Sequence, residues 1–311
     1  MSVIFYLNNW DWVFIYHFLY YTIGGIRHII NNKHNGKLTL YLPYLIEHKH
    51  DIDKEMIVKI TNSKKDIEYP MNTTGVFPTS IANLYYQIFD CLKEKVSVIY
   101  TLKDFDLSTI NVVPLNQTNL LKINIVSFNG ELCGCFVPKE NPHFLRSLFL
   151  PLFPDFNIKP GKRIYITRKN SEFVSRHNGV KKRHVLNEDE LIERLKYLEF
   201  QYVQLEDLSF KEKVELFATS ELILAPNGGG LSFLVFANLK TKFIELFPSY
   251  KLGEYGQTYK ENYAHTQFLH VANILKLNYT RFPDMTFVDN ELNIRVNIDT
   301  LLPFIEKKIS E

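Results

Sequence analysis

The second half of the chain alternates short apolar runs with longer segments whose apolar residues recur every three or four positions. Runs rich in β-branched and aromatic residues, bounded by turn-forming residues, are typical of buried strands, whereas the longer spacing is typical of amphipathic helices. The pattern predicts strands at 163–167, 201–205, 221–225, 242–247 and 278–282, and helices beginning at 188 and spanning 210–219, 231–237 and 262–275. Alternating strands and helices predict a parallel sheet with helices on both faces.

The helix that begins at residue 188 carries a local start signal. Asn187 is a favoured N-cap residue, and Glu190 three positions later completes the pattern of a capping box. Glu188 lies in the first turn, where the helix dipole already explains an acid, so a structural role is favoured over a functional one.

The first half has a weaker pattern. It predicts strands at 38–42, 57–60, 96–101 and 122–128, a helix at 80–92, and a buried amphipathic helix at 13–21. Prolines and a glycine interrupt the pattern between 151 and 161, which predicts a boundary between a first domain, 1–155, and a second domain, 156–311. The last helix of the second domain is able to pack back on the first.

Composition narrows the classes of protein. The 311 residues are 46% hydrophobic and 23% charged with a net charge of +2, which is an ordinary globular balance and argues against a nucleic-acid binder. Three cysteines do not make a disulfide framework, and Cys133-Gly134-Cys135 lacks a second pair to complete a metal site. The apolar segment 13–21 is too short to span a bilayer and follows no basic residue, so a cytoplasmic protein without a membrane span is expected. Heavy use of Asn, Lys, Ile, Phe and Tyr is typical of an AT-rich genome, such as that of a microbe or a large virus.

A glycine-rich loop, Asn227-Gly228-Gly229-Gly230, lies between a predicted strand and a predicted helix. Glycines there allow a close approach of backbone to ligand, and the helix start offers N–H groups to an anion. A tight turn without a ligand is the equal alternative. No Gly-Lys-Ser/Thr follows, and Phe233 stands where the third glycine of G-x-G-x-x-G belongs, so neither common phosphate-binding fingerprint is present.

Charged residues follow the same predicted strand ends. The cations are Arg168, Lys169, Arg176, Lys181, Lys182 and Arg183. Arg168 comes directly after a strand, where an arginine can grip a diphosphate, whereas a solvated surface is the better interpretation of Lys181 and Lys182. Glu245 ends a buried strand, where a carboxylate commonly binds a ribose hydroxyl.

Several blocks of the second half resemble glycosyltransferase family 61. The blocks are Arg163–Ser171, which resembles a strand ending in Arg-x-x-Ser; Arg183–Glu188; Pro226–Leu231, which resembles a Pro-His-Gly-Ala-Gly-Leu loop; Ile244–Pro248; and Tyr263–Tyr279. More loosely, Asn8–Leu19 resembles an early helix of that family. The chain departs from the family pattern at Asn227, where the family has histidine, and at Tyr21, where it has an acid.

The resemblance implies a GT-B fold of two Rossmann-like domains and an inverting transfer of a GlcNAc- or xylose-type sugar from a UDP-sugar to a glycan or glycoprotein hydroxyl, with no metal and no cofactor. The residues expected to bind the donor are Arg168, Lys169, Asn170, Ser171, Arg183, Asn227, Gly228, Gly229, Gly230, Leu231 and Glu245. His17 is the first candidate for the catalytic base and Asp11 the second. The alternatives are an inactive relative that binds a sugar nucleotide or glycan, and a dinucleotide-dependent oxidoreductase, against which the missing third glycine argues.

Overall fold

The computed structural model forms two compact units, residues 1–124 and 125–311. It describes residues 2–7, 16, 18–24, 27, 38–41, 79–99, 110–115, 124–128, 131–153, 161–169, 184–247, 267–282, 284–287 and 293–311. Each unit is built around its own parallel sheet.

The first unit has a four-stranded parallel sheet in the order β3-β2-β1-β4. Its elements are β1 Ser2–Leu7, the π-helical turn η2 Phe18–Ile23, β2 Leu38–Tyr41, α4 Thr79–Cys91, β3 Val96–Ile99 and β4 Ile110–Leu115. The predictions at 38–42, 80–92 and 96–101 are confirmed, whereas β1 and β4 were not expected. The predicted strand at 57–60 lies outside the described residues, and of the helix predicted at 13–21 the structure describes a buried turn around Leu19 and Tyr20.

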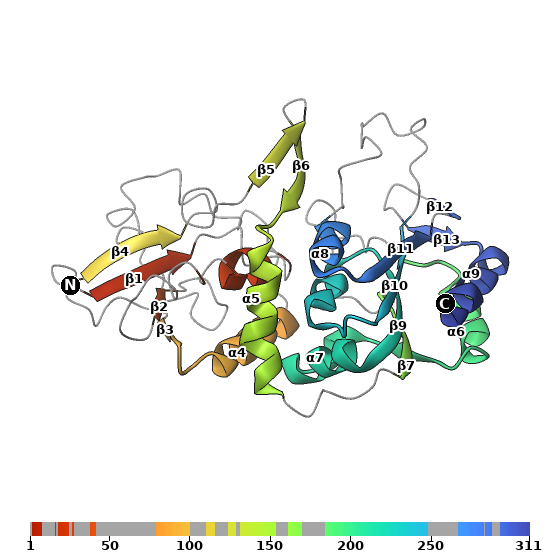
Figure 1. Cartoon of the computed structure of the whole chain (residues 1–311), viewed down its shortest axis with the longest axis horizontal. Coiled ribbons are helices and arrows are strands. Elements are labelled where there is room, and N and C mark those ends of the chain that lie inside the picture. Colours follow the sequence, from red (N-terminus) through yellow and green to blue (C-terminus); the bar gives the residue numbers. More distant parts are fainter. Residues whose placement is uncertain are drawn as a thin grey trace. The chain divides into compact units, whose positions relative to one another are not determined.

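The second unit has a five-stranded sheet in the order β11-β10-β9-β7-β8, with every neighbouring pair parallel (Figure 1). The strands are β7 Lys162–Ile166, β8 Phe200–Val203, β9 Ser220–Pro226, β10 Lys242–Leu246 and β11 Asn278–Phe282. All five strands predicted in the second half are therefore found, each within a few residues of its expected bounds. The predicted α/β class with a parallel, Rossmann-like sheet is confirmed for this unit.

Helices cover both faces of this sheet (Figure 1). One face carries α6 Glu188–Lys196, α9 Ile298–Ser310 and the small antiparallel pair β12 Met285–Phe287 and β13 Ile294–Val296. The other carries α5 Glu140–Phe149, α7 Phe210–Thr219, α8 Gln267–Leu275 and the 3-10 helix η9 Gly229–Phe236. The helix predicted at 231–237 is thus a 3-10 helix, and residues 262–266 of the next predicted helix lie outside the described ranges.

Strand side chains alternate between two different cores, as the two-residue period of a strand requires. Leu222, Leu224, Ile244 and Leu246 pack with α6 and with Leu301 and Ile305 of α9, so the last helix packs on the sheet of its own unit. The opposite face is dominated by aromatic rings, whose contacts join Phe149, Phe210, Phe217, Phe233, Phe236 and Phe243.

The capping box predicted at Asn187 is wrong. α6 does begin at Glu188, but the Asn187 side chain makes no cap hydrogen bond. Its amide instead bonds both backbone groups of Val296, donating to the carbonyl at 2.9 Å and accepting from the N–H at 3.0 Å. The amide therefore joins α6 to β13 across 109 residues of sequence, which local spacing does not reveal. A capping box is present instead at the start of α7, between Ser209 and Glu212.

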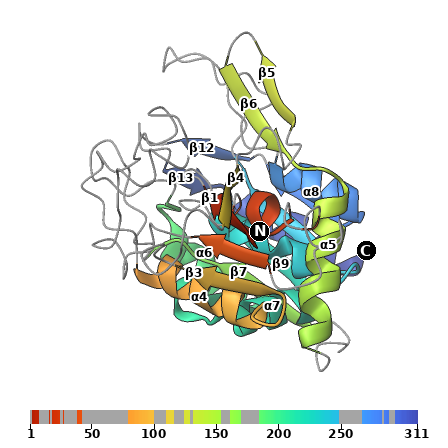
Figure 2. The ribbon, with the colours of Figure 1, turned by 90° about the vertical axis from the view of Figure 1, so that its left-hand side faces the viewer.

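The helix α5 belongs to the second unit although it precedes the boundary predicted at 155/156. Arg146 Nη1 donates to the carbonyls of Val235 and Ala237 at 2.7 and 2.6 Å, at the carboxyl end of η9. Phe149 packs edge-on against Phe210 and Phe236. Before α5, β5 Asn124–Phe128 and β6 Glu131–Phe136 form a two-stranded ribbon, and Figure 2 shows β6 leading directly into the helix. The predicted domain boundary stays a prediction.

Candidate functional site

The strand order of the second sheet places its topological switch point between β7 and β9. From β7 the chain passes through α6 to the edge strand β8, then returns through α7 to β9 on the other side of β7. In open parallel sheets, ligands bind beyond the carboxyl ends of the strands where the order reverses. The segments that follow β7 and β9 are therefore the candidate ligand-binding segments.

Arg168 and the glycine loop meet at this point. Arg168 follows β7, and its Nη1 donates a 3.0 Å hydrogen bond to the carbonyl of Asn227, which follows β9. A Cβ added at Gly228 would overlap Nη1 of Arg168 and lie 2.9 Å from its Cζ. The φ of Gly228 is 166°, which any residue can adopt, so it is the Arg168 guanidinium and not the backbone angle that occupies the space of a side chain here. Sequence reasoning assigned the glycine to the approach of a ligand; the structure fills that space with Arg168.

The remaining loop residues differ in accessibility. Gly229 is exposed, whereas Leu231 is buried in the core at 2% exposure. A Cβ at Gly230 would lie 2.8 Å from Cδ1 of Leu205, so close packing already accounts for that glycine. The first turn of η9 contains no acidic residue, which leaves its N-terminal N–H groups without a competing carboxylate of their own.

Glu245 is fully buried at the end of β10 and both of its oxygens are engaged. Asn227 Nδ2 donates to Oε1 at 2.6 Å, and Arg281 Nε donates to Oε2 at 2.8 Å. Burial raises the pKa of the Glu245 carboxyl, and the charge of Arg281 and the Asn227 hydrogen bond oppose that rise. Glu245 thus links the loop after β9 to β11; its expected contact with a ribose stays a prediction.

Arg281 was missed by sequence reasoning. It lies opposite Glu245 in the register of β10 and β11, and its guanidinium carbon sits 4.1 Å from the centroid of the Phe247 ring. The available signal was an arginine near the carboxyl end of a predicted strand, the same signal that singled out Arg168.

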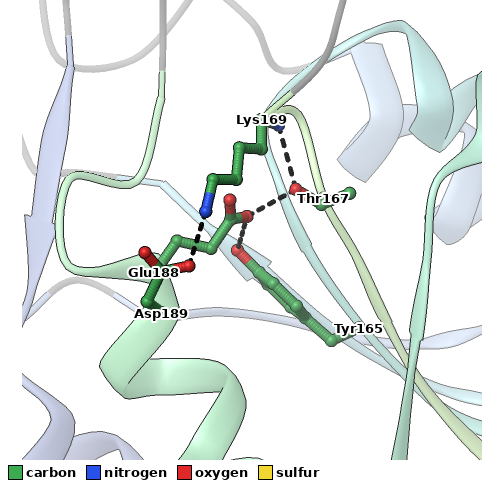
Figure 3. Close-up of polar contacts among 5 residues, drawn as sticks. All are labelled: Tyr165, Thr167, Lys169, Glu188 and Asp189. Atoms are coloured by element: carbon green, nitrogen blue, oxygen red, sulfur yellow. Dashed lines mark hydrogen bonds and ion pairs between the residues drawn. The ribbon is translucent and has the colours of Figure 1, made fainter.

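On the α6 side of the switch point, a second polar cluster surrounds Glu188 (Figure 3). The hydroxyls of Tyr165 and Thr167 both donate to Oε1 of Glu188 at 2.7 Å, and all three side chains are buried. Thr167 Oγ1 also accepts from the backbone N–H of Lys169 at 2.9 Å. Burial and the neighbouring Glu188 hold the pKa of Tyr165 well above its usual value of about 10, so the phenol keeps the proton that it donates.

Lys169 lies at the exposed rim of this cluster. Its Nζ forms a 2.6 Å ion pair with Asp189, whose hydrogen bond and charge raise the pKa of the lysine. Both side chains are solvent-exposed, so solvent screens the pair. The lysine predicted to bind the donor is thus already engaged by an acid of α6.

The other predicted site residues, Asn170, Ser171, Arg183, His17 and Asp11, lie outside the described residues. Among the residues that the structure does describe, no group of three or more His, Cys, Asp or Glu side chains is placed to hold a metal ion. The helices within the same ranges include none that is both long and apolar enough to cross a membrane.

The five-stranded sheet, with its reversal between β7 and β9, places the second unit in the class of doubly wound α/β domains. The family model described as Glycosyltransferase 61 matches residues 41–244, which is more than half of the chain and includes both segments of the switch point. The chain belongs to this glycosyltransferase family. A search of curated proteins gives no significant match.

Proposed function

We propose that the protein is an inverting glycosyltransferase that moves a GlcNAc- or xylose-type sugar from a UDP-sugar to a hydroxyl of a glycan or glycoprotein. Family membership supports the transfer itself and implies a nucleotide-sugar donor with a glycan acceptor. The finer choices of UDP, of inversion and of the sugar rest on the resemblance of the motif blocks and are the subject of the experiments below.

One observation supports the donor site most directly: Arg168 lies against Gly228 at the switch point, beside the start of η9. A guanidinium and the N–H groups of a helix start are both suited to the two negative charges of a leaving diphosphate. Their combined electrostatic stabilisation replaces the role that a metal ion plays in other transferases. We therefore expect UDP to bind without a divalent cation.

The proposed reaction is a single displacement. A base on the first unit takes the proton of the acceptor hydroxyl, and the acceptor oxygen attacks the anomeric carbon. The bond from that carbon to the diphosphate oxygen breaks, and UDP leaves with the electron pair. His17 is the proposed base and Asp11 the reserve, while the second unit positions the donor.

The donor site is tested by titrating UDP calorimetrically with and without EDTA, using a matched pair of arginine variants. β7 carries an arginine near each end, and Arg163 at the amino end binds the carbonyl of Leu198. Arg168→Ala is expected to weaken UDP roughly 100-fold, the scale for removing one partner of a charged hydrogen bond, whereas Arg163→Ala leaves the affinity unchanged. Equal losses in both variants, or binding that disappears in EDTA, contradict the proposal.

A relative that binds a sugar nucleotide without transferring it is the second candidate, because Asn227 and Tyr21 depart from the family pattern. His17→Gln separates the two: an active enzyme is expected to lose roughly 100-fold or more of its turnover while its UDP affinity barely changes. A parent protein that binds UDP-sugars but turns none over favours the inactive relative.

A further inference from the structure

Glu188 occupies a position that its place in a helix does not explain. The first turn of α6 contains three acids, and Asp189 and Glu190 are exposed. Exposed acids are sufficient to complement a helix dipole, which favours negative charge near the N-terminus. Glu188 instead is 5% exposed and packs beneath them against β7. Burying a carboxylate is costly unless hydrogen bonds compensate for the lost water, and here Tyr165 and Thr167 supply them.

The two oxygens of Glu188 have different surroundings. Oε1 accepts both hydroxyl hydrogen bonds, from Tyr165 and Thr167. Oε2 accepts none from the residues that the structure describes, and in Figure 3 no dashed line reaches it. A carboxylate has acceptor capacity on both oxygens, so Oε2 can still accept a hydrogen bond. Among the described residues, hydrogen bonds therefore fix the orientation of Glu188 through Oε1, and none of them engages Oε2.

The charges at the carboxyl ends of the strands indicate which kind of ligand group suits Oε2 of Glu188. The η9 side of the switch point offers Arg168 and a helix start with no acidic residue in its first turn, which suits phosphate. The α6 side offers carboxylates, which repel phosphate but accept hydrogen bonds from neutral hydroxyls. Thr167 and Arg168, the two residues that follow β7, serve one side each, because Thr167 bonds Glu188 and Arg168 bonds the carbonyl of Asn227.

We propose that Oε2 of Glu188 binds hydroxyl groups of the nucleotide sugar while its diphosphate lies on the η9 side. This inference rests on the proposed function and adds a recognition residue to the same edge. Two parts of the donor carry hydroxyls of this chemistry, the ribose and the transferred sugar. Tyr165 and Thr167 act as positioning residues, because they hold the carboxylate in place without contacting the ligand.

The test compares Glu188→Gln with the parent by calorimetric titration of UDP, 2′-deoxy-UDP, 3′-deoxy-UDP, UDP-GlcNAc and UDP-xylose. If the ribose is bound, the parent prefers UDP over a deoxy analogue by roughly ten- to hundred-fold, the scale of a hydrogen bond to a charged group, and the variant loses that preference. If the transferred sugar is bound, the variant loses the preference for a UDP-sugar over UDP. Either result supports the inference.

Matched controls separate recognition from folding. Glu190→Gln changes an exposed acid of the same helical turn and is expected to keep every preference of the parent. Tyr165→Phe removes one hydrogen bond to Oε1 and is expected to reduce the preference partly. The inference is overturned if Glu188→Gln keeps all preferences, or if it weakens every ligand equally together with a lower melting temperature. A parent protein that binds none of the ligands overturns the proposed function and the inference together. A parent that binds UDP, its deoxy analogues and the UDP-sugars with equal affinity overturns only the inference.

Discussion

Two helices begin at the switch point of the second sheet, and their first turns are opposite in character. α6 begins with Glu188, Asp189 and Glu190, so its own carboxylates neutralise the positive end of its dipole. η9 begins with glycines and has no acid in its first turn, and Arg168 lies against it. The same backbone feature thus carries its own carboxylates on one side of β7 and none in its first turn on the other.

A third helix start provides the reference. α7 begins with a complete capping box, in which Ser209 and Glu212 satisfy each other's backbone N–H groups. Such a start needs no ligand and offers none a site. The three helix starts therefore differ in the side chains placed around them, and substitutions at those side chains test the difference.

The largest effect is expected at Glu245, whose carboxylate accepts a hydrogen bond from Asn227 in the loop before η9. Glu245→Ala removes the buried partner of Arg281 and the acceptor of Asn227. Breaking a buried pair by deleting one partner costs about 3–5 kcal/mol, so the free energy of unfolding is expected to fall on that scale in urea denaturation. Glu245→Gln, which keeps an acceptor for Asn227, serves as the milder control. Equal unfolding midpoints for parent and both variants contradict a supporting role.

A smaller and more specific effect is expected at Gly228. Gly228→Ala places a methyl group where the Arg168 guanidinium lies, so the flexible side chain moves and the fold survives. UDP affinity is expected to fall roughly ten- to hundred-fold by calorimetry, with little change in melting temperature.

A double-variant cycle is the control for Gly228. In an Arg168→Ala background the methyl group has nothing to displace, so Gly228→Ala is expected to add almost no further loss. Additive losses contradict the idea that the glycine acts through the arginine.

Sequence patterns predicted this part of the fold well and the site only in outline. The five strands of the second sheet are confirmed because buried parallel strands are continuous apolar runs that turn residues interrupt. Arg168 and Asn227 were singled out separately, and the 3.0 Å contact between them confirms that the two segments meet. The burial of Glu188 was not predictable, because its partners come from β7 and a first-turn acid already has a local explanation.

The wrong and missing predictions also arise from contacts between segments that are distant in sequence. Asn187 has the spacing of a capping residue, but its amide bonds Val296 in a strand more than a hundred residues later. β1 pairs with β4 on one side and with β2 on the other in the first unit, and such pairing between distant segments has no local signal. Conversely, the capping box of Ser209 and Glu212 was present in the sequence and was overlooked.

The third prediction concerns a buried cation outside the proposed site. Lys213 in α7 donates to the carbonyl of Leu208, and burial lowers its pKa to about 8. The unfolded chain keeps this proton up to about pH 10.5, so between pH 8 and 10.5 the unfolded state binds more protons and stability rises with pH. Relative to Lys213→Met, the parent is expected to gain about 1–3 kcal/mol of unfolding free energy between pH 7 and 10.

Urea denaturation of both proteins at several pH values provides the measurement. A stability difference that stays constant across the range contradicts the lowered pKa. UDP affinity is expected to be the same in both proteins at pH 7, because Lys213 bonds a backbone carbonyl of its own helix start and is not part of the proposed donor site.

The smallest effect is expected at the exposed pair of Lys169 and Asp189. Lys169→Met removes a screened surface ion pair, so stability is expected to change by less than about 1 kcal/mol. UDP affinity is expected to change by less than roughly three-fold, which thermal-shift titration resolves. A large loss of UDP affinity contradicts this expectation. It means that Lys169 breaks its ion pair with Asp189 and supplies a cation to the donor on the α6 side.

The close approach of Arg168 to Gly228 also constrains how this family can diverge. The two positions are 60 residues apart (228 − 168), yet a side chain at 228 and a long cation at 168 compete for one volume. Within a lineage, a change that shortens position 168 before position 228 gains a methyl group avoids the clash, whereas the reverse order passes through a displaced arginine. Homologues are therefore expected to show the pair as a correlated change, in which larger residues at 228 accompany short side chains at 168.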